Sequence, residues 1–178
     1  EKKNFQNFYT DFMETTLLEV IKKNIRLQLD AGAEVVMMFD SGISSLENDF
    51  YRGKYRLLLK NISNSFPNKV GYYARGKNYN EISYLLDLPF AGLGVDSNVG
   101  LQHIFLNSKF GFIQGNFNEN HLLLDSKELE NELNTYLDTM KNIDNLNGWV
   151  CGLGHGINKA TPEKNVHLFI ETIRKKFS

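Results

Sequence analysis

The sequence is poor in cysteine and proline and has no surplus of charge of either sign. Its 178 residues include one cysteine, three prolines, and 20 basic against 21 acidic residues. A single cysteine excludes a disulfide framework within the chain and is compatible with a reducing compartment. Because there is neither a basic surplus nor a clustered basic face to bind a phosphate backbone, we expect no nucleic-acid partner.

Long hydrophobic runs are also lacking. The longest lies around Glu34 to Phe39 and falls far short of the roughly 20 residues that cross a bilayer, so we expect no membrane span. The chain opens Glu1-Lys2-Lys3-Asn4 without a methionine, which we interpret as the absence of the natural N-terminus. We expect a cytoplasmic protein, and organellar targeting stays open because a missing segment could carry a leader.

What the sequence does contain is an alternation of helical and strand patterns. Apolar residues recur at three- to four-residue spacing over 12–30, 55–62 and 129–140 and again after Thr161, which is typical of amphipathic helices. Shorter helices are expected at 79–86 and 101–106. The short apolar runs between them are typical of buried strands. The expected strands are Val35–Phe39, Val70–Ala74, Phe90–Val95, Phe110–Ile113 and Trp149–Leu153.

Two of the helices carry signals for their first residues. Asp125, with Glu128 three residues later, resembles a capping box at the start of one helix. Thr161 is the expected N-cap of the last helix, with Pro162 at its first position.

Five strands that alternate with helices predict an α/β fold with a parallel sheet. An open doubly wound sheet and part of a barrel both fit this pattern. Polar or glycine-rich loops follow nearly every strand and no G-x-G-x-x-G fingerprint leads into a helix, which favours the (β/α)8 TIM barrel. Because a complete barrel needs about 250 residues, we interpret residues 1–178 as a single-domain fragment. It would hold strands four to eight, the C-terminal part of the barrel, with the N-terminal half absent.

The loops that follow the strands carry a family resemblance. The segments that carry it are Ala31–Ser41, Gln114–Asn116, Leu153–Ile157 (L-G-H-G-I) and Thr161–Val166 (T-P-E-K-N-V). In order and spacing they resemble the C-terminal half of uroporphyrinogen decarboxylases, over essentially the whole chain. The last two segments are the most specific.

The resemblance implies a carboxy-lyase of haem and porphyrin biosynthesis, which is a homodimer in this family. Such an enzyme removes the four acetate carboxyl groups of uroporphyrinogen III to give coproporphyrinogen III, with no cofactor and no metal. Protonation of a pyrrole carbon makes the ring an electron sink, CO₂ leaves, and a second proton completes the methyl group. Positioned charged groups therefore replace a cofactor.

The same resemblance assigns roles to four residues. His155, after the last strand, is the expected catalytic residue and also binds the tetrapyrrole, and Ser41 lines the same cleft. Asp96 matches an acidic residue at a strand end, and Arg75 could pair with a substrate carboxylate as a fork. The family's central aspartate belongs to the strands that this sequence lacks, so we expect the fragment alone to be inactive.

Two departures from the family pattern keep other functions open. Gly42-Ile43 stands where the family usually has Trp-Ala or His-Ala, and Ser97 stands where it has tryptophan. A tetrapyrrole-binding relative without catalytic activity is one alternative. A corrinoid-dependent methyltransferase of the same superfamily is less favoured, since its zinc site needs a His-x-Cys pair and a later cysteine, whereas this chain has only Cys151.

Other strand-end residues have structural interpretations. Gln114 and Asn116 are expected to bond backbone groups of their loop, and Cys151 to be a small core residue. A five-strand piece of a barrel leaves two sheet edges unpaired and one side of the core uncovered. Such a chain alone is expected to aggregate, to dimerise, or to bind the missing half.

Overall fold

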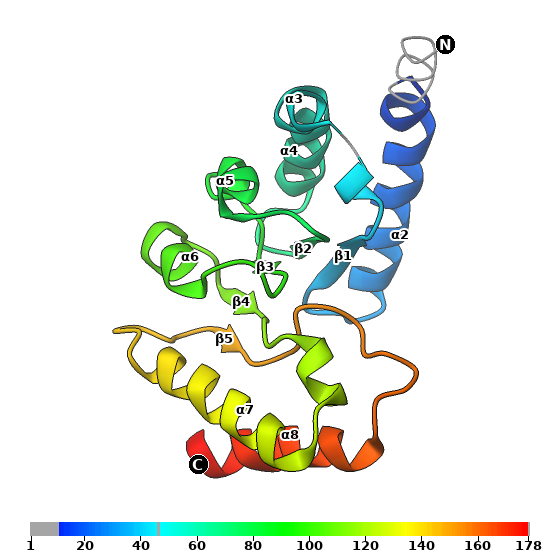
Figure 1. The fold of residues 1–178 in the computed structure, drawn as a ribbon. Coiled ribbons are helices and arrows are strands. Elements are labelled where there is room, and N and C mark those ends of the chain that lie inside the picture. The colour runs from blue at the N-terminus through cyan, green and yellow to red at the C-terminus, as the bar shows by residue number, and fades with distance from the viewer. Residues whose placement is uncertain (1–10, 46, 178) are drawn as a thin grey trace.

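The computed structural model describes residues 11–45 and 47–177. Five parallel strands form one sheet in the order β1-β2-β3-β4-β5 (Figure 1). The strands are β1 (Val36–Asp40), β2 (Val70–Ala74), β3 (Gly92–Gly94), β4 (Phe112–Gln114) and β5 (Trp149–Val150). The expected α/β fold, that of a partial TIM barrel, is confirmed.

A helical segment precedes β1, the other helices follow the strands, and together they lie in an arc outside the sheet (Figure 1). The α-helices are α2 (Leu18–Asp30), α3 (Asn48–Phe50), α4 (Arg56–Ser65), α5 (Tyr79–Ile82), α6 (Leu101–Asn107), α7 (Ser126–Lys141) and α8 (Glu163–Phe177). Five shorter turns are the π-helices η1 (Met13–Leu17) and η3 (Tyr51–Tyr55) and the 3₁₀ helices η2 (Ile43–Ser45), η4 (Ser83–Leu85) and η5 (Glu119–Leu123). Within 11–45 and 47–177, no helix has the length and apolar character needed to span a membrane.

The strands are shorter than the apolar runs that predicted them. β2 has the expected bounds, but only Gly92–Gly94 of the run Phe90–Val95 pairs as a strand. Phe90 instead stacks on Tyr72, with ring centroids 5.6 Å apart, and so belongs to the core beneath the sheet. β5 ends at Val150, although Leu153 still pairs with Phe117 in an isolated parallel bridge.

The two predicted helix starts have different outcomes. Asp125 caps α7, because its carboxylate accepts bonds from the backbone N–H groups of Lys127 and Glu128, each at 2.9 Å. The Thr161 prediction is wrong: α8 begins at Glu163, and the Thr161 hydroxyl is buried without a hydrogen-bond partner among the described residues. The buried Asn165 fixes this helix start instead, since its side chain donates to the carbonyls of Leu122 and Leu124.

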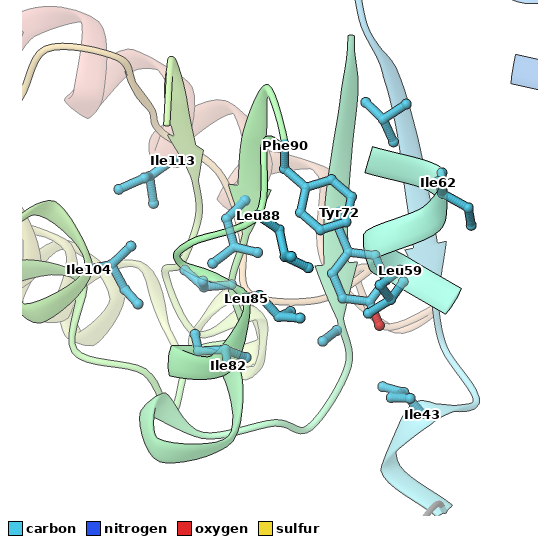
Figure 2. Close-up of a cluster of buried hydrophobic side chains, with 14 of the residues drawn as sticks. Ile43, Leu59, Ile62, Tyr72, Ile82, Leu85, Leu88, Phe90, Ile104 and Ile113 are labelled. Atoms are coloured by element: carbon cyan, nitrogen blue, oxygen red, sulfur yellow. The ribbon is translucent and has the colours of Figure 1, made fainter. Parts of the chain in front are cut away.

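The main core lies between the sheet and its helices. Side chains of Tyr72 in β2 and Ile113 in β4 meet residues of α4, α5 and α6 there (Figure 2). Burial of each such side chain contributes about 1.5–3 kcal/mol. The fully buried side chains of this main core include Ile43, Tyr72, Leu85, Phe90, Leu93 and Ile104. A second cluster, Phe117, Leu122, Leu129, Leu133, Leu137 and Phe169, joins α7 to α8 and η5.

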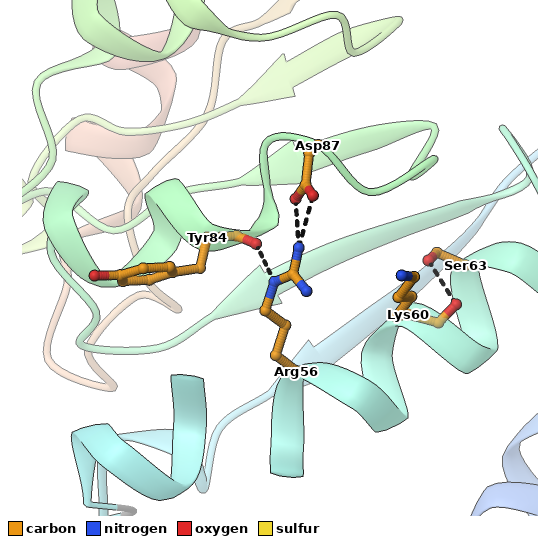
Figure 3. Close-up of polar contacts among 5 residues, drawn as sticks. All are labelled: Arg56, Lys60, Ser63, Tyr84 and Asp87. Atoms are coloured by element: carbon orange, nitrogen blue, oxygen red, sulfur yellow. Dashed lines mark hydrogen bonds and ion pairs between the residues drawn. The ribbon is translucent and has the colours of Figure 1, made fainter. Parts of the chain in front are cut away.

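An ion pair at the surface also orients a loop on this side. The guanidinium of Arg56, at the start of α4, donates from Nη2 to both carboxylate oxygens of Asp87 at 2.7 and 2.8 Å (Figure 3). Its Nε donates to the carbonyl of Tyr84 at 2.7 Å. These contacts tie α4 to the segment that leads into β3. Exposed pairs of this kind contribute at most about 1 kcal/mol.

The opposite face of the sheet, here called the inner face, is built from two rows of paired residues. The first row is Met37, Gly71, Gly92 and Phe112, and the second is Phe39, Tyr73, Gly94, Gln114 and Val150. The glycines make room for their neighbours, since a Cβ on Gly92 would lie 2.4 Å from the Phe112 ring. Phe39 and Val150, at the edge strands, are 66% and 45% exposed. The inner face is thus apolar and partly open to solvent.

Candidate functional site

A cavity of about 550 Å³ opens on the inner face where the strands end. It brings together Ser41, which follows β1, and His155, which follows β5. Polar loops at the carboxyl ends of parallel strands are where TIM barrels place their sites. The cavity is lined by Met37, Phe39, Ser41, Tyr73, Gly94, Val95, Gln114, Leu153, Gly154, His155 and Gly156.

His155 lies half-buried in this lining. Its Nδ1 is 3.2 Å from the carbonyl oxygen of Gly156. In the tautomer that carries the proton on Nδ1 this contact is a hydrogen bond, and Nε2 is then an acceptor. An imidazole in this state can accept a proton at Nε2 and give it back. The predicted catalytic residue therefore lines the cavity, and proton exchange with a ligand there stays a prediction.

The loop that carries His155 is anchored through Gly154, its neighbour. The backbone N–H of Gly154 donates to the carbonyl of Phe117 at 2.8 Å, and its carbonyl accepts from the Tyr73 hydroxyl, also at 2.8 Å. A Cβ on Gly154 would lie 2.4 Å from the backbone nitrogen of Ser97. Only glycine fits this approach, which explains the first glycine of the Gly-His-Gly sequence, whereas a Cβ on Gly156 would meet no atom within 4 Å.

Asp96 holds two loops by their backbones. Its Oδ2 accepts from the N–H of Gly76 at 2.9 Å, and its Oδ1 accepts from the N–H of Ser97 at 2.8 Å. Gly76 has a φ of +70°, a conformation that favours glycine. Asp96 thereby ties the loop after β2 to the end of β3, and it is not part of the cavity lining. Its role in substrate binding stays a prediction.

Arg75 is exposed in the loop that Asp96 holds. It is not part of the cavity lining, but its guanidinium is near enough to the Tyr73 hydroxyl to lower the pKa of that group. The position suits a side chain that reaches toward an anionic ligand at the rim of the cavity. A fork with a substrate carboxylate also stays a prediction.

Tyr73 is a polar member of the cavity lining that the sequence reasoning missed. Burial and the nearby Asp96 carboxylate raise the pKa of its hydroxyl to about 12, against the opposing effect of Arg75. The phenol therefore stays protonated at neutral pH and acts as a donor. The available signal was the two-residue period of β2, which places Tyr73 on the same face as Gly71.

Ser41 is positioned by a hydrogen-bond network behind the sheet. The side chain of Asp40, the last residue of β1, accepts bonds from the hydroxyls of Tyr55 and Tyr72, the latter at 2.9 Å. Burial raises the pKa of Tyr72 well above its ordinary value, so that hydroxyl stays a donor. These bonds hold the end of β1 on the face of the sheet that the helices cover. Ser41, the next residue, lines the cavity on the inner face.

Lys77 and Glu81 form a buried ion pair beside the same strand ends. Lys77 is 3% exposed, its Nζ lies 3.1 Å from Oε1 of Glu81, and it lies over the ring of Tyr51 at 4.9 Å from the centroid. Glu81 also completes a capping box with Asn78 at the start of α5. The loop after β2 is therefore anchored at Lys77 as well as at Gly76.

The remaining expected residues separate by role. Asn116 is buried and its side chain donates to the carbonyls of Asp96 and Val99 at 2.7 and 2.6 Å, so its structural interpretation is confirmed. Gln114, by contrast, lines the cavity. Cys151 is partly buried against the α7–α8 cluster, and burial raises the pKa of its thiol to about 12. Within the described ranges no three His, Cys, Asp or Glu side chains gather as a metal site.

Comparison with known proteins gives a consistent result. The family model "Uroporphyrinogen decarboxylase (URO-D)" matches residues 7–176. The chain is similar to the uroporphyrinogen decarboxylase of Orientia tsutsugamushi strain Ikeda, at 29% identity over 85% of this chain and 45% of that protein. It is 31% identical to that of Chlamydia muridarum, over 93% of this chain and 51% of the relative. The chain thus spans about half the length of the curated relatives it matches.

Proposed function

Because the chain belongs to the uroporphyrinogen decarboxylase family, we propose that it forms strands four to eight of a (β/α)8 carboxy-lyase. The reaction is the conversion of uroporphyrinogen III to coproporphyrinogen III, without a cofactor or metal. The observation that carries the proposal is the cavity at the strand ends that Ser41 and His155 share. The homodimer and the cytoplasmic location implied by the family are part of the same proposal.

The inner face supports a complementary half-barrel as the main partner. β1 and β5 are the edge strands of the sheet, and each carries an exposed apolar side chain, Phe39 and Val150. Exposed edges and apolar faces favour association. Three further strands would pair both edges, cover this face, and supply the aspartate that gathers the pyrrole N–H groups in the family.

The residues of this chain have distinct roles in the proposed reaction. His155 exchanges a proton at Nε2 with the substrate. Protonation of a pyrrole carbon lets the bond between the acetate methylene and the carboxylate break, with its electron pair moving into the ring, and CO₂ leaves. A second proton then adds to the exocyclic methylene to complete the methyl group, and the ring carbon gives up the first proton, which restores the aromatic pyrrole. The Ser41 hydroxyl donates to a substrate carboxylate, and Arg75 balances its charge from the rim.

One observation keeps a binding function without catalysis as the second candidate. At Gly42, where the family usually carries a large side chain, a Cβ would meet no atom within 4 Å. The space that such a side chain occupies in the family is therefore open in this chain, next to Ser41. A relative with this change could hold a tetrapyrrole in a pose that does not react. The corrinoid-dependent methyltransferase has less support, because its zinc thiolates would need more than the single, partly buried Cys151.

The test of the proposed function is turnover by the full-length gene product. We expect incubation with uroporphyrinogen under anaerobic, reducing conditions to give stepwise loss of carboxyl groups down to the four-carboxyl product. The porphyrinogens are followed by carboxyl count after oxidation to porphyrins. Retained binding of the tetrapyrrole without loss of CO₂ would contradict the proposal and favour the binding relative.

The open inner face leads to a prediction for residues 1–178 alone. We expect this chain to sediment as a dimer or larger species, because isolated sheet edges and an apolar face associate in water. Replacement of Phe39 and Val150 by serine is expected to shift the distribution toward monomer. A monodisperse wild-type monomer in sedimentation velocity would contradict the expectation.

A further inference from the structure

The hydroxyl of Tyr73 makes a hydrogen bond that crosses the inner face. It donates to the carbonyl of Gly154 at 2.8 Å, between residues 81 positions apart in the sequence. Tyr73 lies in β2 and Gly154 follows β5, so β3 and β4 separate the two in the sheet. The bond therefore joins distant parts of the sheet directly, over the intervening strands.

The sequence leaves room for the Tyr73 ring to cross. Its neighbour in the register is Gly94, where a Cβ would lie 3.1 Å from the Tyr73 Cβ and 3.2 Å from its Cδ2. On the other side the ring of Phe39 lies with its centroid 5.9 Å away. A larger residue at position 94 would crowd the ring, so its orientation depends on that glycine.

Gly154 is held by a second bond, through its backbone N–H. Its N–H donates to the carbonyl of Phe117, beyond the end of β4. The carbonyl that Tyr73 binds belongs to the peptide unit joining Gly154 to His155. Its direction sets the plane of that peptide and thereby the direction in which the His155 side chain leaves the backbone.

We propose that Tyr73 is a positioning residue that sets the His155 imidazole in the cavity by holding the carbonyl of Gly154. The catalytic consequence rests on the proposed function, whereas the effect on the loop does not. The raised pKa of Tyr73, about 12, keeps the hydroxyl protonated over the working pH range. The Tyr73 hydroxyl is therefore present as a donor throughout that range.

The test compares Tyr73→Phe with Tyr72→Phe in the full-length protein. Each variant loses one hydroxyl from β2, but the Tyr72 hydroxyl bonds Asp40 behind the sheet. In Tyr73→Phe we expect amide hydrogen exchange of residues 154–156 to rise about tenfold, the equivalent of one lost bond. The NMR titration of the His155 ring is expected to shift, and kcat to fall more than KM changes. Tyr72→Phe is expected to leave the loop exchange and the His155 titration unchanged.

Gly94→Ala provides a second variant that keeps the Tyr73 hydroxyl but crowds its ring. We expect it to loosen the same loop, with the protection of the β2 amides confirming that the protein is folded. Loop exchange and His155 titration unchanged in both Tyr73→Phe and Gly94→Ala would overturn the proposal. If the wild-type protein shows no turnover, the proposed function fails, while the exchange and titration still decide the role of Tyr73.

Discussion

Replacement of His155 by alanine is expected to lower kcat for uroporphyrinogen decarboxylation by the full-length enzyme by about 100-fold to 10,000-fold. This is the range contributed by a positioned general acid or base. The imidazole lines the cavity, and because its Nδ1 lies 3.2 Å from the Gly156 carbonyl oxygen, Nε2 is the nitrogen that we expect to exchange the proton. Alanine removes the proton carrier and leaves the glycines on either side unchanged. The measurement is the initial rate of loss of the first carboxyl group under anaerobic conditions.

The matched control is His167→Ala. His167 is exposed on α8, where its Nε2 lies 3.5 Å from Oε1 of Glu163, and it is not part of the cavity lining. We expect this variant to keep the wild-type rate, because a solvated helical pair of this kind affects stability only slightly. A His155→Ala enzyme with a rate within a few-fold of wild type would exclude proton exchange by this residue. An equal fall in rate in both variants would indicate a general loss of folded protein.

The fold was predictable because each buried strand is a short run of apolar residues with a polar loop after it. The strand Val70–Ala74 has the same bounds as the apolar run that predicted it, since the charged residues Lys69 and Arg75 flank that run. Phe90 was wrongly assigned to a strand because its apolar character fits the core beneath the sheet equally well. The start of α8 was wrong because a tertiary contact from Asn165, invisible to a local capping pattern, fixes it.

The site was predictable only where a motif marked it. Ser41 and His155 were predicted from the family resemblance of the strand-end loops, and both line one cavity in the structure. Tyr73 carries no motif, since its role depends on the register that sets it beside Gly94 and on a contact with Gly154. Pairing across a sheet and contacts across its face are not encoded in local spacing. The burial of the Lys77–Glu81 ion pair likewise depends on tertiary contacts. Breaking this pair is the change from which we expect the largest loss of stability.

Replacement of Lys77 by methionine is expected to lower the free energy of unfolding by about 3 kcal/mol, because it leaves the Glu81 carboxylate buried without its ammonium partner. The side chains of the pair are only 4% and 11% exposed. Methionine fills most of the volume of lysine, so packing against Tyr51 is largely kept. The measurement is chemical denaturation at pH 7. A Lys77→Met/Glu81→Gln double variant is expected to regain most of the loss, since no charge is then buried and the amide oxygen can still accept from the Asn78 N–H.

Lys176→Met is the matched control, because Lys176 pairs with Asp138 at 2.8 Å on the surface, where the carboxylate is 62% exposed. We expect a cost below about 1 kcal/mol there. If Lys77→Met lowered the free energy of unfolding by no more than Lys176→Met does, the Lys77–Glu81 pair would be effectively solvated as well.

The pH dependence of stability gives the Lys77–Glu81 prediction a second, independent measurement. Burial raises the pKa of Glu81, but the N–H of Asn78 and the Lys77 ammonium outweigh it and hold that pKa below the ordinary value of 4.5. A carboxyl whose pKa is lower in the folded state stabilises the protein above its unfolded pKa, and this stabilisation is lost as the pH falls through the folded value. We therefore expect wild-type stability to fall below about pH 4.5, and Lys77→Met to lose less over that range. Parallel stability curves for the two proteins would show that Lys77 does not set the pKa of Glu81.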